Sequence, residues 1–184
     1  FRSTSDGTLF ALTETVENKT GDLVKLNNDG TVEKIGETGI DGLMTALGFG
    51  PEDELYALDQ ETNALYELST ETGEAALLYD EFGEEFVRGG DLVVTEENDL
   101  IYVRSNGEVH SVDLNSLEEE TVAVESLGSL PQDGRNYTSL FLIAGELYAA
   151  DEMHDELYRF TDDASEAELV SRTSGPFYLG DGAS

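Results

Sequence analysis

Side chains suited to acid–base or nucleophilic chemistry are few in this sequence of 184 residues. Cysteine is absent, which excludes thiolate nucleophiles and thiolate zinc sites. The sequence has two histidines, His110 and His154. His110 lies among the valines of an alternating segment, which predicts a packing or surface position, whereas His154 lies in a polar turn, where an imidazole can serve as a ligand. We therefore predict no catalytic residue and count His154 among the candidate binding residues.

Carboxylates are so abundant that their number does not show which of them bind a metal or take part in catalysis. The 41 aspartates and glutamates offer oxygen ligands for a hard cation such as Ca²⁺, but no segment matches the EF-hand loop. Asp91, Asp151 and Asp155 are the candidate metal ligands. A glycosidase-like pair of carboxylates cannot be singled out, because with so many acids some pair will fall at a suitable separation by chance. We expect no resident cofactor, with Ca²⁺ as the exception to test.

Arginine and aromatic side chains, which commonly anchor binding surfaces, gather in the segments that connect successive sequence repeats. With His154 they make up the predicted ligand-binding set: Phe86, Arg88, Arg135, Asn136, Tyr137, Phe177 and Tyr178. Arg88 and Arg135 occupy near-equivalent repeat positions, so they could attract an anionic group to an otherwise acidic surface. The alternative is that the aromatic rings fill gaps between repeats and the arginines pair with neighbouring carboxylates.

Acidic residues dominate the charge. With 9 lysines and arginines, the formal net charge is −32. The cations are scattered along the chain without forming a basic stripe, which argues against nucleic acid and anionic membranes as partners. The negative charges repel one another and destabilise a compact fold. Salt screens this repulsion, since the Debye length is about 3 Å at 1 M. The composition predicts a halophilic or marine microbial protein, and an acidic secreted protein is the alternative.

The first residue of the chain and the length of its apolar segments indicate where in or outside the cell the protein is expected. The sequence begins at Phe1 and not at Met, as it would after removal of a leader, so we expect an extracellular, periplasmic or cell-surface protein. No stretch approaches the roughly 20 apolar residues of a membrane-spanning helix, so no span is predicted.

A fourfold repeat of short apolar segments must position all of these side chains. One segment, called strand b, recurs at 8–12, 54–58, 99–103 and 146–150. Strand c follows it and alternates apolar with polar residues at 22–26, 64–68, 108–112 and 156–160. Strand d follows a turn at 31–35, 75–79, 121–125 and 168–172. Strand a precedes strand b at 44–49, 90–94 and 137–142.

The first repeat gains its strand a if the chain is read as a circle. Residues 181–184 followed by 1–12 align without a gap to residues 43–58, so that Ser184 corresponds to Ala46 and Phe1 to Leu47. Strand a then recurs at nearly equal intervals around the circle. We predict that the two termini meet in one inner strand.

Four antiparallel strands per repeat, without a helical pattern, predict an all-β fold of the β-propeller type with four blades of four strands. The chain is read as one domain, 1–184, with approximate blades at 1–37 plus 176–184, 38–84, 85–130 and 131–175. A β-sandwich is the alternative fold, although the regular repeat argues against it. A half-ring that pairs with a second chain, or an excerpt of a longer array, are alternatives for closure.

The segments Leu55-Tyr-Ala-Leu-Asp59, Leu65-Tyr-Glu-Leu-Ser69 and Thr70-Glu-Thr-Gly73 resemble the repeats of bacterial and archaeal β-propeller proteins. The resemblance covers the whole chain and implies the blade fold, but it says almost nothing about function. In six-bladed lactonase-like propellers, Glu, Asn and Asp from several inner strands hold a metal in the central channel. The matching strands here offer mainly Asp91.

We therefore expect a binding or scaffold propeller and not an enzyme. It would be secreted or surface-exposed, a monomer or homodimer, and would recognise a protein, glycan or small anionic ligand. The predicted binding face carries the loops from strand d to the next strand a (d–a loops) and the turns between strands b and c (b–c turns), with the long turn 13–21 as a rim. The alternatives are a divalent-cation-dependent hydrolase or lyase with a site in the central channel, and a structural half-ring that assembles into a larger propeller.

Overall fold

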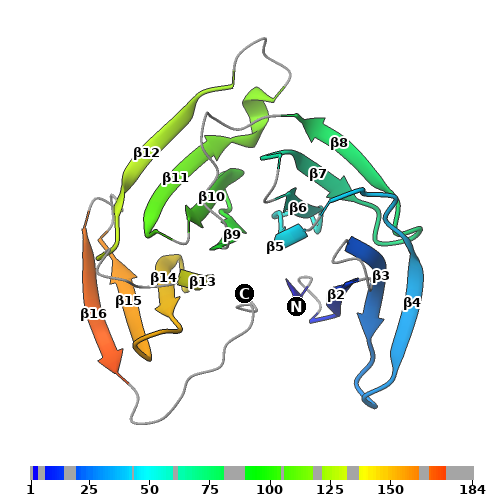
Figure 1. Ribbon diagram of the computed structural model, residues 1–184, viewed down its shortest axis with the longest axis horizontal. Coiled ribbons are helices and arrows are strands. Elements are labelled where there is room, and N and C mark those ends of the chain that lie inside the picture. Colours follow the sequence, from blue (N-terminus) through cyan, green and yellow to red (C-terminus); the bar gives the residue numbers. More distant parts are fainter. Residues whose placement is uncertain are drawn as a thin grey trace.

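The computed structural model describes residues 2–3, 7–14, 20–42, 44–59, 62–80, 90–104, 106–117, 122–131, 137–161 and 166–172. Within these ranges the chain forms four sheets, each of four antiparallel strands that follow one another in chain order (Figure 1). The first strand of each sheet is innermost and the fourth is outermost, so each sheet is one blade. The predicted all-β propeller with four blades is confirmed.

The strands of the four blades have the following bounds. Blade 1 contains β1 (Arg2–Ser3), β2 (Leu9–Glu14), β3 (Thr20–Leu26) and β4 (Val32–Glu37). Blade 2 contains β5 (Met44–Phe49), β6 (Leu55–Asp59), β7 (Leu65–Leu68) and β8 (Ala75–Tyr79). Blade 3 contains β9 (Gly90–Val94), β10 (Asp99–Arg104), β11 (Glu108–Asp113) and β12 (Val124–Ser129), with a 3₁₀ turn at Leu114–Ser116. Blade 4 contains β13 (Tyr137–Ile143), β14 (Glu146–Asp151), β15 (Glu156–Phe160) and β16 (Ala167–Arg172).

Hydrophobic cores lie between consecutive blades. Blades 1 and 2 share a core that includes Phe10, Leu23, Leu47 and Leu55. Blades 2 and 3 share one that includes Leu58, Leu65, Leu92 and Tyr102. Blades 3 and 4 share one that includes Val93, Val103, Leu140 and Tyr158. Blades 1 and 4 lie at the two ends of this series (Figure 1), and the described residues contain no core cluster that joins them.

Position within a blade explains the hydrophobic pattern. Every residue of β6 is buried, because an inner strand is covered on both faces by the neighbouring blades. All of β16 except Ala167 is exposed, because the outermost strand has a free edge and little cover. Burial therefore falls from the inner strands to the outermost strand of a blade.

The strand register tests the circular alignment at its N-terminal side. Arg2 pairs with Phe10 and Ser3 with Leu9, just as Gly48 pairs with Tyr56 and Phe49 with Leu55 in blade 2. Residues 2–3 are therefore strand a of blade 1, as predicted. The predicted continuation through 181–184, and with it the meeting of the termini, lies outside the described residues.

One predicted strand is misplaced. The outer strand of blade 3 begins at Val124, whereas the sequence analysis placed it at 121–125. The cause is the 3₁₀ turn after β11, which Asp113 caps by accepting the backbone N–H of Asn115. Leu114 and Val122 pack into the core between blades 2 and 3, so the chain turns inward before the outer strand begins.

No helix in the part of the chain that the structure describes has the length and apolarity needed to cross a membrane.

Candidate functional site

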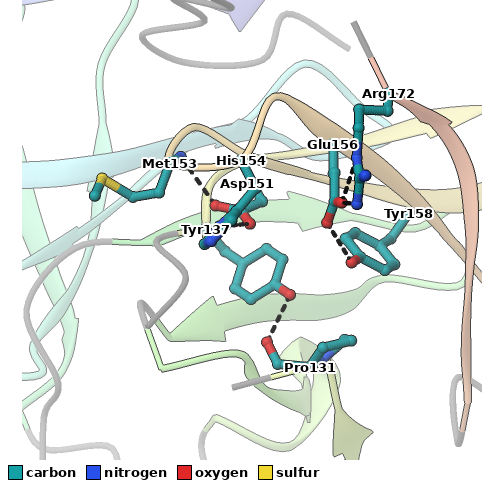
Figure 2. Close-up of polar contacts among 8 residues, drawn as sticks. All are labelled: Pro131, Tyr137, Asp151, Met153, His154, Glu156, Tyr158 and Arg172. Carbon is teal, nitrogen blue, oxygen red and sulfur yellow. Dashed lines mark hydrogen bonds and ion pairs between the residues drawn. The ribbon is translucent and has the colours of Figure 1, made fainter. Parts of the chain in front are cut away.

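A row of four residues crosses blade 4 at the edge that carries the b–c turns. Tyr137 pairs with Asp151, Asp151 with Glu156, and Glu156 with Arg172. Directly opposite residues of antiparallel strands lie on the same face of a sheet, so their side chains are brought close together. We call these residues the blade 4 row; Figure 2 shows them with Pro131, Met153, His154 and Tyr158.

Asp151 organises the b–c turn. Its side chain is fully buried, and Oδ1 accepts the backbone N–H of Met153 at 2.9 Å. Oδ2 lies 2.8 Å from Nδ1 of His154, whose side chain is 41% exposed. A carboxylate that binds one ring nitrogen fixes the orientation and tautomer of an imidazole. Because Nδ1 is committed to Asp151, a ligand would contact Nε2.

Glu156 holds the second exposed group of this edge. Its side chain is also fully buried; Oε2 accepts the hydroxyl of Tyr158 at 2.6 Å and Oε1 accepts Nε–H of Arg172 at 2.8 Å. Arg172 Nη2 contacts the same Oε1. The hydrogen bonds and the opposite charge offset the cost of burying the carboxylate. The side chain of Arg172 nevertheless remains 64% exposed, so a positive charge is held at the surface in a defined orientation.

Tyr137 lies in the core, and the prediction that placed it on the binding surface is wrong. Its residue is fully buried, its hydroxyl donates to the carbonyl of Pro131 at 2.8 Å, and its ring packs edge-to-face on Tyr158 with centroids 6.1 Å apart. The reason is its position at the start of an innermost strand, which the neighbouring blade covers.

Of the three candidate metal ligands, Asp91 lies on a different blade from Asp151 and Asp155. Asp91, on the inner strand β9, is 1% exposed and its two oxygens accept the backbone N–H groups of Leu92 and Leu140 at 2.9 and 2.8 Å. Asp151 binds Met153 and His154, and Asp155 occupies the same turn with a positive φ of 56°. Within the described ranges, no group of three or more His, Asp and Glu side chains is arranged to hold a metal ion. Ca²⁺ binding stays a prediction.

The remaining predicted binding residues lie outside the described residues: Phe86, Arg88, Arg135, Asn136, Phe177 and Tyr178. Most of the predicted rim, at 15–19, does so as well. Of the predicted set, the structure therefore places His154 and Tyr137.

Sequence reasoning missed Met153, Glu156 and Arg172. Met153 is 66% exposed beside His154. Arg172 reaches the same edge because it pairs with Glu156, which in turn pairs with Asp151. The available signal was positional: Glu156 begins β15, Arg172 ends β16, and Met153 lies in the turn between β14 and β15. We call Met153, His154 and Arg172 the blade 4 surface. It combines an exposed thioether with two groups that can carry positive charge, an arrangement suited to an apolar side chain next to a carboxylate.

The architecture defines the chain as a four-bladed β-propeller (Figure 1). It superposes on a Bacteroides thetaiotaomicron protein of unknown function with a TM-score of 0.76 and 13% identity, covering 100% of this chain and 53% of the other. It also superposes on virginiamycin B lyase from Staphylococcus aureus with a TM-score of 0.58 and 11% identity, covering 94% of this chain and 58% of the other. The superposition on a chain of the nidogen/laminin complex has a TM-score of 0.65 and 12% identity, and it covers 92% of this chain and 64% of the other.

These similarities concern the fold. The chain spans 53%, 58% and 64% of the length of these three solved structures. No protein-family model matches the sequence, and no curated protein matches it significantly.

Proposed function

We propose that this propeller is a non-catalytic binding or scaffold module that recognises a peptide segment of a partner protein at the blade 4 surface. The observation that carries the proposal is the pair of supported anchors. His154 is held by Asp151 and Arg172 by Glu156, and both supporting carboxylates are fully buried while the held side chains remain exposed.

Rigid support matters because binding has an entropic cost. Immobilising a rotamer-rich side chain at an interface costs about 0.5–1.5 kcal/mol. The hydrogen bonds of Glu156 already restrict Arg172, and that of Asp151 restricts His154, so part of this cost is met before binding. Arginine and methionine are also enriched at protein interfaces. The blade 4 surface therefore has the residue types expected of a binding site, and two of its side chains are already conformationally restricted.

The chemistry of the surface selects the partner. Arg172 and protonated His154 attract a carboxylate, and Met153 offers an adaptable apolar contact. We infer that the partner segment carries an acidic residue next to an apolar one. The similarity to a chain of the nidogen/laminin complex supports a protein partner at the level of fold. We further propose, from the net charge, that the protein works in a salty medium.

The lyase alternative receives less support. The likeness to virginiamycin B lyase is one of fold at 11% identity. Both carboxylate oxygens of Asp91 accept backbone N–H groups, which gives this inner-strand acid a structural role. Binding without catalysis is therefore our proposal for the blade 4 surface.

Selection of displayed random peptides against the full chain tests this proposal. We expect enrichment of peptides with an acidic residue beside an apolar one, and at least tenfold weaker binding of these peptides to a Met153→Ser/His154→Ala variant. Both replacements leave the Glu156–Arg172 pair intact. Ile143→Ser is the matched control, because Ile143 is 52% exposed at the opposite edge of the same blade. Peptides that bind wild type and the double variant equally, or a selection without enrichment, would contradict the proposal.

A further inference from the structure

A second polar cluster lies on blade 3, away from the blade 4 surface. Tyr102 and Arg104 are two residues apart on β10, and Glu108 and His110 are two residues apart on β11. Tyr102 pairs directly with His110. Because side chains alternate along a strand, all four lie on one face of the sheet. We call them the blade 3 cluster. Tyr102 is part of the core between blades 2 and 3, so this face is turned toward blade 2.

The four side chains contact one another. The rings of Tyr102 and His110 stack with centroids 5.2 Å apart and an interplanar angle of 21°. Nη1 of Arg104 donates to Oε2 of Glu108 at 3.0 Å. Nε2 of His110 lies 3.8 Å from the same oxygen, which is too long for a hydrogen bond.

Three buried polar atoms of this cluster lack a hydrogen-bond partner within the described part of the chain. They are the hydroxyl oxygen of Tyr102, Nε of Arg104 and Nε2 of His110. Tyr102 is 3% exposed, and the side chains of Arg104 and His110 are 13% and 15% exposed. Buried polar atoms are nearly always paired, so three on neighbouring side chains indicate a place where an acceptor is missing.

Protonation makes this set a group of donors. Burial raises the pKa of Tyr102, so its hydroxyl stays protonated at neutral pH and can donate. Arg104 is always charged, and with Nη1 committed to Glu108 its unpaired Nε belongs to the side-on edge of the guanidinium. That edge matches the two oxygens of a carboxylate. The neutral imidazole of His110 can donate through Nε2 in one of its tautomers.

Charge and space restrict the ligand. Glu108 already balances part of the positive charge of Arg104, so a monoanion fits this cluster better than a dianion. The unpaired atoms are almost completely covered by the protein, so only a ligand of few heavy atoms can reach all three. A small monocarboxylate meets both conditions.

We propose that the blade 3 cluster is a binding site for a small monocarboxylate such as formate or acetate, held by Arg104 Nε, the Tyr102 hydroxyl and His110 Nε2. This site lies on a different blade from the blade 4 surface, and the proposal does not depend on the function assigned to that surface. Binding would fill the interface between blades 2 and 3 with the acceptor that its three donors lack.

The two histidines make a direct test possible, because each reports on one of the two sites. Imidazole resonances of the full chain are followed by NMR during titration with sodium formate, and with sodium chloride at matched ionic strength. We expect a saturable shift of the His110 signals with formate alone and a rise in the pKa of His110, because a bound anion stabilises the imidazolium. The His154 signals report separately on the blade 4 surface, so a formate response there is not counted as binding at the blade 3 cluster.

Variants locate the binding. Arg104→Lys keeps the charge but loses the side-on edge, so the apparent Kd for formate should rise at least tenfold. Tyr102→Phe removes one donor and preserves the packed ring, so it should weaken binding severalfold in a folded protein. Arg159→Lys, at a half-exposed site on blade 4, is the matched control and should leave the Kd unchanged.

Three results would each overturn the proposal. They are a His110 signal that ignores formate, as expected if ordered water alone satisfies the donors; an equal response to chloride; and an unchanged Kd in Tyr102→Phe.

Discussion

Oδ2 of Asp91 in blade 3 accepts the backbone N–H of Leu140 in blade 4 at 2.8 Å, across 49 positions of sequence. Oδ1 of the same carboxylate accepts the N–H of Leu92 at 2.9 Å. Both strands are innermost in their blades, so this side chain links two adjacent blades near the centre of the propeller. Asp91, which the sequence suggests as a candidate metal ligand, thus has a structural role.

Asp91→Asn tests this link. An amide has one oxygen acceptor in place of two, so either Leu92 or Leu140 loses its buried acceptor. We expect the free energy of unfolding to fall by about 1–3 kcal/mol, measured by urea denaturation. Glu96→Gln, at an exposed position, is the control and should change little. A fully stable Asp91→Asn protein would show that the link contributes nothing.

The Glu156–Arg172 pair should show strong coupling. Arg172→Met leaves the buried Glu156 charge with the Tyr158 hydroxyl and without its cation, at a cost of about 1–3 kcal/mol. The cost falls short of that for a fully buried pair because Arg172 is 64% exposed. The single Glu156→Gln variant should be less stable than wild type. In the Arg172→Met background, however, Glu156→Gln should restore part of the lost unfolding free energy. A double-mutant cycle of urea unfolding measures the coupling, and additive effects would contradict it.

Acid should weaken the interface between blades 2 and 3 through His110. Burial, and then the charge of Arg104, lower the pKa of His110, while Glu108 opposes this. The unfolded imidazole titrates near pH 6.5. The unfolded chain therefore binds the proton more readily, so the contribution of neutral His110 is complete above about pH 6.5 and is lost as the pH falls toward the folded pKa.

The measurement is the urea midpoint of wild type and His110→Gln at about pH 7.5 and about pH 5.5, on either side of the imidazole titration. Their difference should shrink or reverse in acid. Arg159→Lys, which replaces one cation by another at a half-exposed site, is the control, and its difference from wild type should be the same at both pH values. A difference that is the same at both pH values for His110→Gln would refute the expectation.

Close packing of inner strands leaves little room for a side chain at Gly48. A Cβ added at Gly48 would overlap Cδ1 of Leu92 on the neighbouring blade. Gly48→Ala should therefore cost about 1–3 kcal/mol through overpacking. Adding Leu92→Val, which shortens the opposing side chain, should recover part of the loss in the same denaturation assay. No recovery would locate the strain elsewhere.

Salt should stabilise the fold, since the formal net charge is −32. Screening reduces repulsion among the carboxylates, so the melting temperature should rise steadily from low to molar sodium chloride. Circular dichroism melts across this series measure the effect. A melting temperature that ignores salt would count against the halophilic interpretation.

Local patterns in the sequence account for the blades. Period-2 alternation and turn residues predicted sheets of four strands, and the repeat alignment predicted the pairing of residues 2–3 with β2. These features depend on pairing between segments that are neighbours in the sequence, so short-range signals are enough. The start of β12 was missed because Leu114 and Val122 turn inward to a core shared with another blade.

Contacts between blades, and between strand ends, were decided by the tertiary structure. The sequence placed Tyr137 at the surface, whereas packing of blade 3 on blade 4 buries it. Arg172 reaches Glu156 only through the register of the outer hairpin. The reason is physical: a strand pattern states which face is apolar, but the neighbour that covers this face depends on how whole sheets pack.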